Sequence, residues 1–243
     1  MIRFIGVYDY TVLLTYISLF CSIFGITKAV GGDFNTAVFC LAMSGLCDAF
    51  DGRVARSKKN RTEDERSFGI QLDSLCDVIC FGLFPGIICF YRGVRGPLGL
   101  FLIFFFCTCG LIRLAFFNVL EAKRQQEEGQ GAGNKTYRGL PITSVAFIMP
   151  LVYWIGNVFL PETVFLVLLH VMLAMVGILF ILDFRLRKPK FKTLMIMVGA
   201  TAITVGAIYA YSKLRHNNVV DEDDTTVETI EGTNESSYET ENT

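Results

Sequence analysis

Long runs of apolar residues, each about the length needed to cross a lipid bilayer, fill most of the first 211 positions of this chain. A transmembrane helix needs roughly 20 consecutive, mainly apolar residues. The composition agrees with such helices, because 52% of the 243 residues are hydrophobic, whereas soluble domains contain about 45–50%. The sequence therefore predicts an all-α, polytopic membrane protein with seven helices, at residues 11–30, 34–56, 68–91, 97–120, 140–158, 162–183 and 191–211.

Basic residues are distributed unevenly between the two ends of these predicted helices. If the N-terminus is cytoplasmic, sixteen lysines and arginines fall on the cytoplasmic side and five on the opposite side. Cytoplasmic loops of membrane proteins carry an excess of Lys and Arg, so we expect this orientation.

The composition changes near the C-terminus. Residues 217–243 contain nine acidic residues and no Lys or Arg, and a segment of this kind cannot bury enough apolar surface to fold. We therefore expect a transmembrane core at residues 1–190, an additional transmembrane helix at 191–211 and a disordered acidic tail at 212–243.

Four aspartates interrupt the apolar pattern in the second and third predicted helices. Asp48 and Asp51 are three residues apart, and Asp73 and Asp77 are four apart, so each pair lies on one helical face. Two antiparallel helices can bring these faces together, and four carboxylates at one point repel each other unless cations bind. Oxygen ligands favour Mg²⁺, Mn²⁺ or Ca²⁺, and two such ions suit displacement at phosphorus. In the orientation above, this site lies at the cytoplasmic side of the membrane.

Small residues share the two aspartate faces. Gly52 and Ala55 follow the first pair and Gly69 precedes the second, so a bulky group can approach the backbone there. Arg56 adds a planar guanidinium that suits phosphate oxygens. Together these residues predict a phosphate-bearing ligand that binds beside divalent metal ions.

Two other interpretations of the aspartates remain open. The first is a set of structural salt bridges with Arg53, Arg56 or Arg113. The second is the pathway of a divalent-cation transporter, although transporters more often have internal repeats and place such acids near the middle of the membrane.

The motif Asp48-x2-Asp51-Gly52-x2-Ala55-Arg56, followed by Gly69-x3-Asp73-x3-Asp77, resembles the signature of the CDP-alcohol phosphatidyltransferase family. One feature departs from the family pattern, because twelve residues separate Arg56 from Gly69 where eight are usual. The resemblance implies a six-helix core, here residues 1–190, that usually forms a homodimer.

The resemblance also implies roles for the residues of the motif. All four aspartates would bind Mg²⁺ or Mn²⁺, and Asp77 would also act as the general base. Gly52, Ala55, Arg56 and Gly69 would contact the cytidine and diphosphate of CDP-diacylglycerol. The implied reaction is attack by an alcohol on the phosphorus next to diacylglycerol, with release of CMP.

Three further stretches, at residues 72–82, 110–118 and 138–144, resemble the phosphatidylserine synthase branch of this family, although Phe116 stands where that branch often has Arg. L-serine is therefore the expected acceptor, with glycerol 3-phosphate or an inositol phosphate as alternatives. Those alternatives carry a phosphate and would need a denser basic pocket. Membrane lipids are further expected partners, and nucleic acid is not.

Arg113 is a cation within a predicted membrane helix and needs an anionic partner. The carboxylate of serine, a lipid phosphate and a site aspartate are the candidates. Asn118, Thr143 and Ser144 are candidates for the polar groups of serine, although Asn118 could instead cap a helix and Thr143 could only pack. Three hydroxyl residues also form a stripe on the first helix, where they serve helix packing or contact a ligand: Thr15, Ser18 and Ser22.

Overall fold

A computed structural model describes residues 6–58, 62–127, 137–186 and 206 of the chain. The predicted seventh helix and the acidic tail lie outside these residues, apart from Gly206. The chain divides into two units, Met1–Val205 and Gly206–Thr243. All elements described below belong to the first unit.

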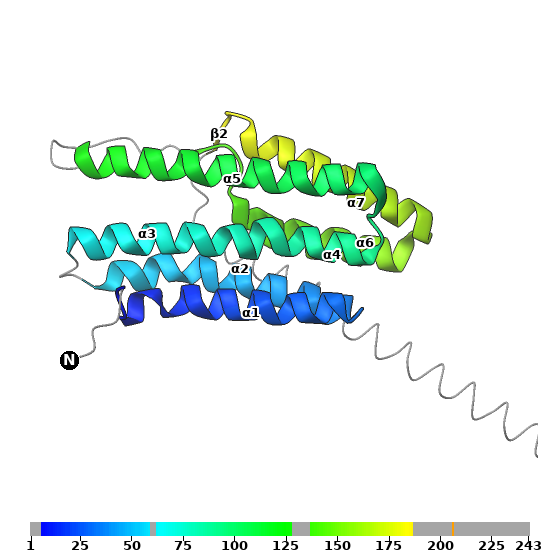
Figure 1. Cartoon of the computed structure of the whole chain (residues 1–243), viewed down its shortest axis with the longest axis horizontal. Helices are drawn as coiled ribbons and strands as arrows, with labels where there is room; N and C mark the ends of the chain where they lie inside the picture. The colour runs from blue at the N-terminus through cyan, green and yellow to red at the C-terminus, as the bar shows by residue number, and fades with distance from the viewer. Residues whose placement is uncertain (1–5, 59–61, 128–136, 187–205, 207–243) are drawn as a thin grey trace, which may run out of the picture. The chain divides into compact units, whose positions relative to one another are not determined.

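The first unit is a bundle of long helices (Figure 1). The described elements, in chain order, are η1 (Tyr10–Val12), α1 (Leu13–Val30), α2 (Phe34–Ser57), α3 (Glu63–Asp77), the π-helical segment η2 (Val78–Leu83), α4 (Phe84–Arg92), α5 (Gly96–Glu127), β1 (Tyr137–Arg138), η4 (Ile142–Ser144), α6 (Val145–Phe159), α7 (Glu162–Ile181) and β2 (Arg185–Leu186). The strands are only two residues long and pair with each other in antiparallel orientation. The predicted all-α class is confirmed.

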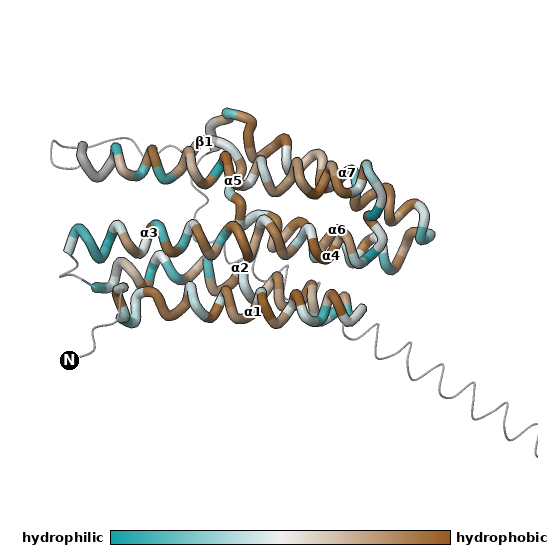
Figure 2. The backbone as a smooth tube through the Cα atoms, in the orientation of Figure 1, coloured by the Kyte–Doolittle hydropathy of each residue, from teal (hydrophilic) through white to brown (hydrophobic). Residues whose placement is uncertain are grey.

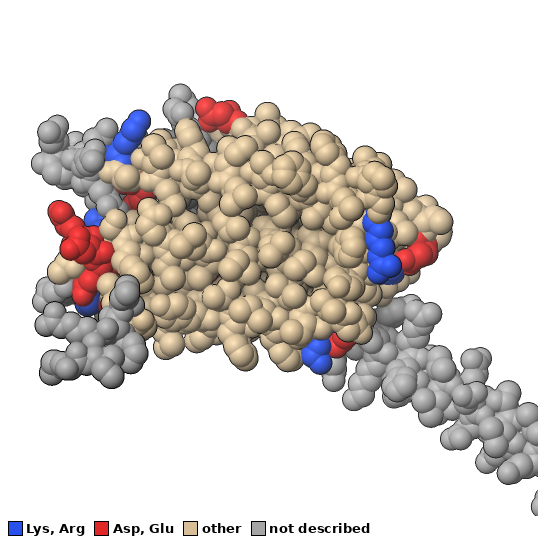
Figure 3. Space-filling view, in the orientation of Figure 1, with Lys and Arg blue, Asp and Glu red and all other residues tan. Residues whose placement is uncertain are grey.

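Among the described residues, five helical stretches are long and apolar enough to cross a membrane: Tyr10–Val30, Glu63–Arg92, Gly96–Lys123, Ile142–Phe159 and Glu162–Ile181. Figure 2 shows apolar residues along most of their length and polar residues gathered at the outer ends of α3 and α5. On the face shown in Figure 3, most charged side chains lie toward the two ends, apart from acidic side chains at the upper edge, and a broad uncharged surface lies between them. The chain is therefore a polytopic membrane protein, as predicted.

The third predicted helix begins at Glu63, five residues before its predicted start. A capping box explains the earlier start: the Glu65 N–H donates to Thr62 Oγ1 at 3.2 Å, and the Thr62 N–H donates to Glu65 Oε2 at 3.1 Å. This arrangement satisfies backbone donors at a helix end. Three acidic residues in the first turn are also favourable at the positive end of the helix dipole.

An irregular stretch interrupts this helix just before Pro85. Proline has no N–H to donate to the residue four positions earlier. The irregularity lies before the proline, because residues 78–83 are π-helical and the Phe84 N–H donates to the Ile79 carbonyl. Single π-helical turns are frequent at functional sites, and this one follows Asp77 directly.

The start of α6 also differs from its prediction. The sequence places it at residue 140, but the helix begins at Val145 after the 3-10 turn η4. Gly139 has a positive φ of 71° and its N–H donates to the Phe184 carbonyl at 2.8 Å. Pro141 then has an extended backbone. Residues 139–141 therefore form a loop that is held against the end of α7.

Close approach of α6 to α2 fixes this loop beside the rest of the bundle. A Cβ atom added at Gly45 of α2 would overlap the side chain of Ala146 in α6. The element η4 also packs against α2 and η2. The entry to α6 is thus held next to the part of α2 that carries Asp48.

Candidate metal centre

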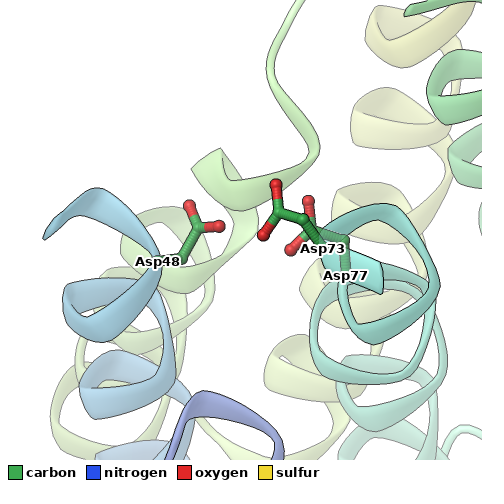
Figure 4. Close-up of side chains that lie close together, drawn as sticks. All are labelled: Asp48, Asp73 and Asp77. Atoms are coloured by element: carbon green, nitrogen blue, oxygen red, sulfur yellow. The ribbon is translucent and has the colours of Figure 1, made fainter. Parts of the chain in front are cut away.

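Three aspartates converge where α2 and α3 face each other (Figure 4). Asp48 comes from α2, and Asp73 and Asp77 come from successive turns of α3. One carboxylate oxygen from each lies within 4.8 Å of the other two. The two helical faces predicted from the spacing of the aspartates therefore do meet.

Asp51, the fourth aspartate of the motif, lies outside this group of three. Its side chain is 9% exposed, and it interacts electrostatically with the other three carboxylates. Its Oδ2 accepts a hydrogen bond from Thr15 Oγ1 of α1 at 3.4 Å. A third helix therefore contributes to the site.

The side chains present fit a hard divalent cation. Asp73 Oδ1 is buried and has no hydrogen-bond partner within the described part of the chain. Buried polar atoms are nearly always hydrogen-bonded, so this oxygen suits a ligand outside the protein. The donor set consists of carboxylate oxygens, which Mg²⁺ and Mn²⁺ prefer.

The residues predicted to contact CDP-diacylglycerol lie one helical turn from the aspartates. Gly52 and Ala55 follow Asp48 and Asp51 on α2, and Gly69 precedes Asp73 on α3. Gly52 is exposed, whereas Ala55 and Gly69 are half-buried. The backbone of Arg56 belongs to α2, and its side chain lies outside the described structure.

A polar network connects the N-terminal segment to both aspartate helices. Lys58, which follows α2, lies 2.8 Å from Asp9 Oδ2 and 3.1 Å from Glu65 Oε2, measured from its Nζ. Hydrogen bonds from Lys58 and Thr11 lower the pKa of Asp9 to about 2. This network fixes the polar ends of α2 and α3 beside each other.

Arg113 on α5 is buried, with 7% of its surface exposed. Its Nε donates to the Leu140 carbonyl at 3.0 Å, and its guanidinium carbon lies 5.7 Å from the centre of the Phe117 ring. Arg113 therefore contacts the loop that leads into η4.

Asn118 also joins α5 to the aspartate helices. Its Oδ1 accepts a hydrogen bond from Ser74 Oγ at 2.8 Å, and Ser74 is the neighbour of Asp73 on α3. Asn118 does not cap a helix, because α5 continues to Glu127. Ser74 was not a predicted site residue, since nothing in the sequence pairs it with a residue 44 positions away.

Thr143 and Ser144 both belong to η4, which packs against α2 and against η2, the segment that follows Asp77. Thr143 is half-buried. Ser144 is 9% exposed, and its Oγ has no hydrogen-bond partner among the described residues. The site thus contains two buried oxygen atoms with unused hydrogen-bonding capacity, on Asp73 and Ser144.

Comparison with known proteins agrees with the motif. The family model for CDP-alcohol phosphatidyltransferase matches residues 10–182. The chain is 39% identical to the CDP-diacylglycerol–serine O-phosphatidyltransferase of Saccharomyces cerevisiae over 111 residues, which cover 45% of this chain and 38% of that protein. It is 32% identical to the archaetidylserine synthase of Methanothermobacter thermautotrophicus over 152 residues, which cover 59% of this chain and 57% of that protein.

A similar match is found with the CDP-diacylglycerol–serine O-phosphatidyltransferase of Helicobacter pylori, at 33% identity over 147 residues, covering 60% of this chain and 57% of that protein. The chain thus spans about half the length, or less, of these curated relatives. The family match covers the whole described helical bundle from η1 to the end of α7. The chain belongs to the CDP-alcohol phosphatidyltransferase family.

Proposed function

We propose that this protein transfers the phosphatidyl group of CDP-diacylglycerol to the hydroxyl of L-serine and so produces phosphatidylserine and CMP. The observation that carries this proposal is the convergence of Asp48, Asp73 and Asp77 in a chain of this family. The names of the relatives support serine, because two specify it as the acceptor and the third specifies a serine-containing product.

The four aspartates would hold the metal, and we propose two ions, either Mg²⁺ or Mn²⁺. Such ions, when bound, neutralise charge on phosphate oxygens and orient the groups that react. The buried and unpartnered Oδ1 of Asp73 supports this assignment. Gly52, Ala55 and Gly69 would leave room for the cytidine and diphosphate, and Arg56 would bind phosphate oxygens.

Asp77 is proposed as the general base. Its carboxylate would accept the proton of the serine hydroxyl while the hydroxyl oxygen bonds to the phosphorus next to diacylglycerol. The bond from that phosphorus to the oxygen of the CMP leaving group would then break. The support is positional, because Asp77 is 9% exposed and belongs to the group of three converging carboxylates.

The acceptor pocket is proposed to lie between α5 and η4. Ser144 Oγ is buried without a partner in the described structure, so it is suited to a polar group of serine. A guanidinium has five N–H donors, so the bond from Arg113 to Leu140 is compatible with a second bond to the serine carboxylate. Asn118 and Thr143 complete the proposed set and lie on the same two elements.

We place the active site on the cytoplasmic side, because the excess of basic residues lies at this end of the helices. A Thr62→Cys variant in sealed, right-side-out vesicles should resist labelling by a membrane-impermeant maleimide until the vesicles are opened. The control is a variant with Cys at Gly32, in the turn between α1 and α2 at the opposite end. Labelling of the Thr62→Cys variant in intact vesicles would reverse the assigned orientation.

The proposal also includes a homodimer, which chemical cross-linking in membranes would test.

Serine should be the preferred acceptor when purified protein is given CDP-diacylglycerol with one acceptor at a time. We expect turnover with serine to exceed turnover with glycerol 3-phosphate or inositol phosphate at least about 100-fold, because each buried polar group left unpaired costs about 1–3 kcal/mol. The measurement is CMP release together with identification of the lipid product.

Protein with Asp77→Asn provides the background rate for this assay. Faster turnover with a phosphorylated acceptor would reject serine but keep the reaction type. If no acceptor releases CMP while proteoliposomes conduct divalent cations, the transporter alternative would replace the enzyme.

A further inference from the structure

The first helix carries a buried polar stripe that none of the roles proposed above includes. Thr15, Ser18 and Ser22 are each at most 6% exposed, although α1 otherwise consists mainly of apolar residues. All three hydroxyls make hydrogen bonds to α2, which carries Asp48 and Asp51. The stripe therefore joins α1 to an aspartate helix and faces away from lipid.

Hydrogen bonds to Ser44 set the register between these two helices. Ser18 Oγ lies 2.7 Å from Ser44 Oγ, and Ser22 Oγ donates to the same atom at 2.9 Å. Thr15 lies seven residues before Ser22, and Asp51 lies seven residues after Ser44. Because seven residues are about two helical turns, this antiparallel register places Thr15 opposite Asp51.

The contact between Thr15 and Asp51 acts on one oxygen of the carboxylate. Thr15 Oγ1 donates to Asp51 Oδ2 at 3.4 Å, and both residues are at least nine-tenths buried. A carboxylate has two oxygens that accept hydrogen bonds or bind metal. A donor on Oδ2 restricts rotation of the group and so fixes the direction in which Oδ1 points.

We propose that Thr15 is a positioning residue, which holds the carboxylate of Asp51 in the orientation that binds metal. The inference rests on the proposed function for one point, that a divalent ion is held by the four aspartates, Asp51 included. Groups that orient metal ligands in this way typically change metal affinity by about 10–100-fold when they are removed. The hydroxyl of Thr15 is the part that matters, so valine, which has the same shape without it, should not replace threonine.

The test is an electron paramagnetic resonance titration of Mn²⁺ with the purified full-length protein, without CDP-diacylglycerol and without any acceptor. Thr15→Val should weaken Mn²⁺ binding about 10–100-fold, and Thr15→Ser should bind nearly as the wild type does. Thr27→Val is the matched control on the same helix, because the Thr27 hydroxyl donates to the Phe24 carbonyl of its own helix.

A second readout separates positioning from a general loss of structure. Turnover by Thr15→Val should need a higher Mn²⁺ concentration but should approach the wild-type rate when Mn²⁺ is saturating. Thr15→Ala serves as a second variant without the hydroxyl, and thermal melting confirms that each variant is folded.

Equal Mn²⁺ affinity in the wild type and in Thr15→Val would overturn the role of Thr15 and leave the metal site intact. A wild-type protein that binds no Mn²⁺ would overturn the metal site and this role together. The two failures are therefore distinguishable in one titration.

Discussion

Replacing Asp77 with Asn is expected to lower turnover by about 100–10,000-fold, the usual contribution of a general base. The amide has nearly the size of the carboxyl group but cannot accept the proton of the acceptor hydroxyl. Asp77 is 9% exposed and belongs to the cluster with Asp73 and Asp48. Replacing its carboxylate with an amide therefore also removes one negative charge from the cluster. CDP-diacylglycerol should still bind, because the other three aspartates remain.

The measurement combines CMP release with direct binding of CDP-diacylglycerol to the same purified variant. Asp33→Asn is the matched control: Asp33 caps the start of α2 through a bond from the Thr36 N–H at 3.1 Å, at the end of the helix remote from Asp48. Near-normal turnover in the Asp77 variant would reject the general-base role. Loss of both turnover and binding would instead assign Asp77 to ligand binding alone.

Removal of divalent metal should have an effect of similar size. Excess EDTA is expected to reduce turnover at least about 100-fold, because metal ions stabilise charge at a reacting phosphate by several kcal/mol. Addition of Mn²⁺ or Mg²⁺ beyond the chelator should restore activity. The structural basis is the group of three carboxylate oxygens within 4.8 Å, whose mutual repulsion a cation relieves.

Initial rates of CMP release before and after chelation give this result. EDTA that is already saturated with Mg²⁺ controls for effects of the chelator on the lipid or detergent. Turnover that persists in excess EDTA would contradict the metal site, whatever the acceptor is.

The fold and the aspartate cluster could be predicted because both depend on local spacing. Apolar runs of bilayer length indicate membrane helices, and offsets of three and four residues place Asp48 with Asp51 and Asp73 with Asp77. The spacing of the aspartates does not show in which direction each carboxylate oxygen points. Asp51 lies outside the closest group of three, and its carboxylate accepts a hydrogen bond from Thr15 on a third helix.

The contacts around the proposed acceptor pocket were harder to predict, because they join distant segments of the chain. Arg113 donates to Leu140, and Asn118 accepts from Ser74. Neither pair has a sequence signal, since the partners are 27 and 44 residues apart. The start of α6 was predicted too early for a related reason: Gly139 and Pro141 form a loop that hydrogen-bonds to the end of α7.

The π-helical segment after Asp77 sets the angle between the helical faces of α3 and α4, which it joins into one continuous helix. Each residue of an α-helix advances the side-chain direction by about 100°, and a π-helical segment accommodates one extra residue within that progression. The face of α3 that carries Asp73 and Asp77 is thereby offset from the face of α4 that buries Phe84 and Ile88. If residues 78–83 kept their number but closed as a regular α-helix, one face would rotate by roughly 100° relative to the other. The direction of the carboxylates and the packing of the membrane segment are therefore set separately along a single helix.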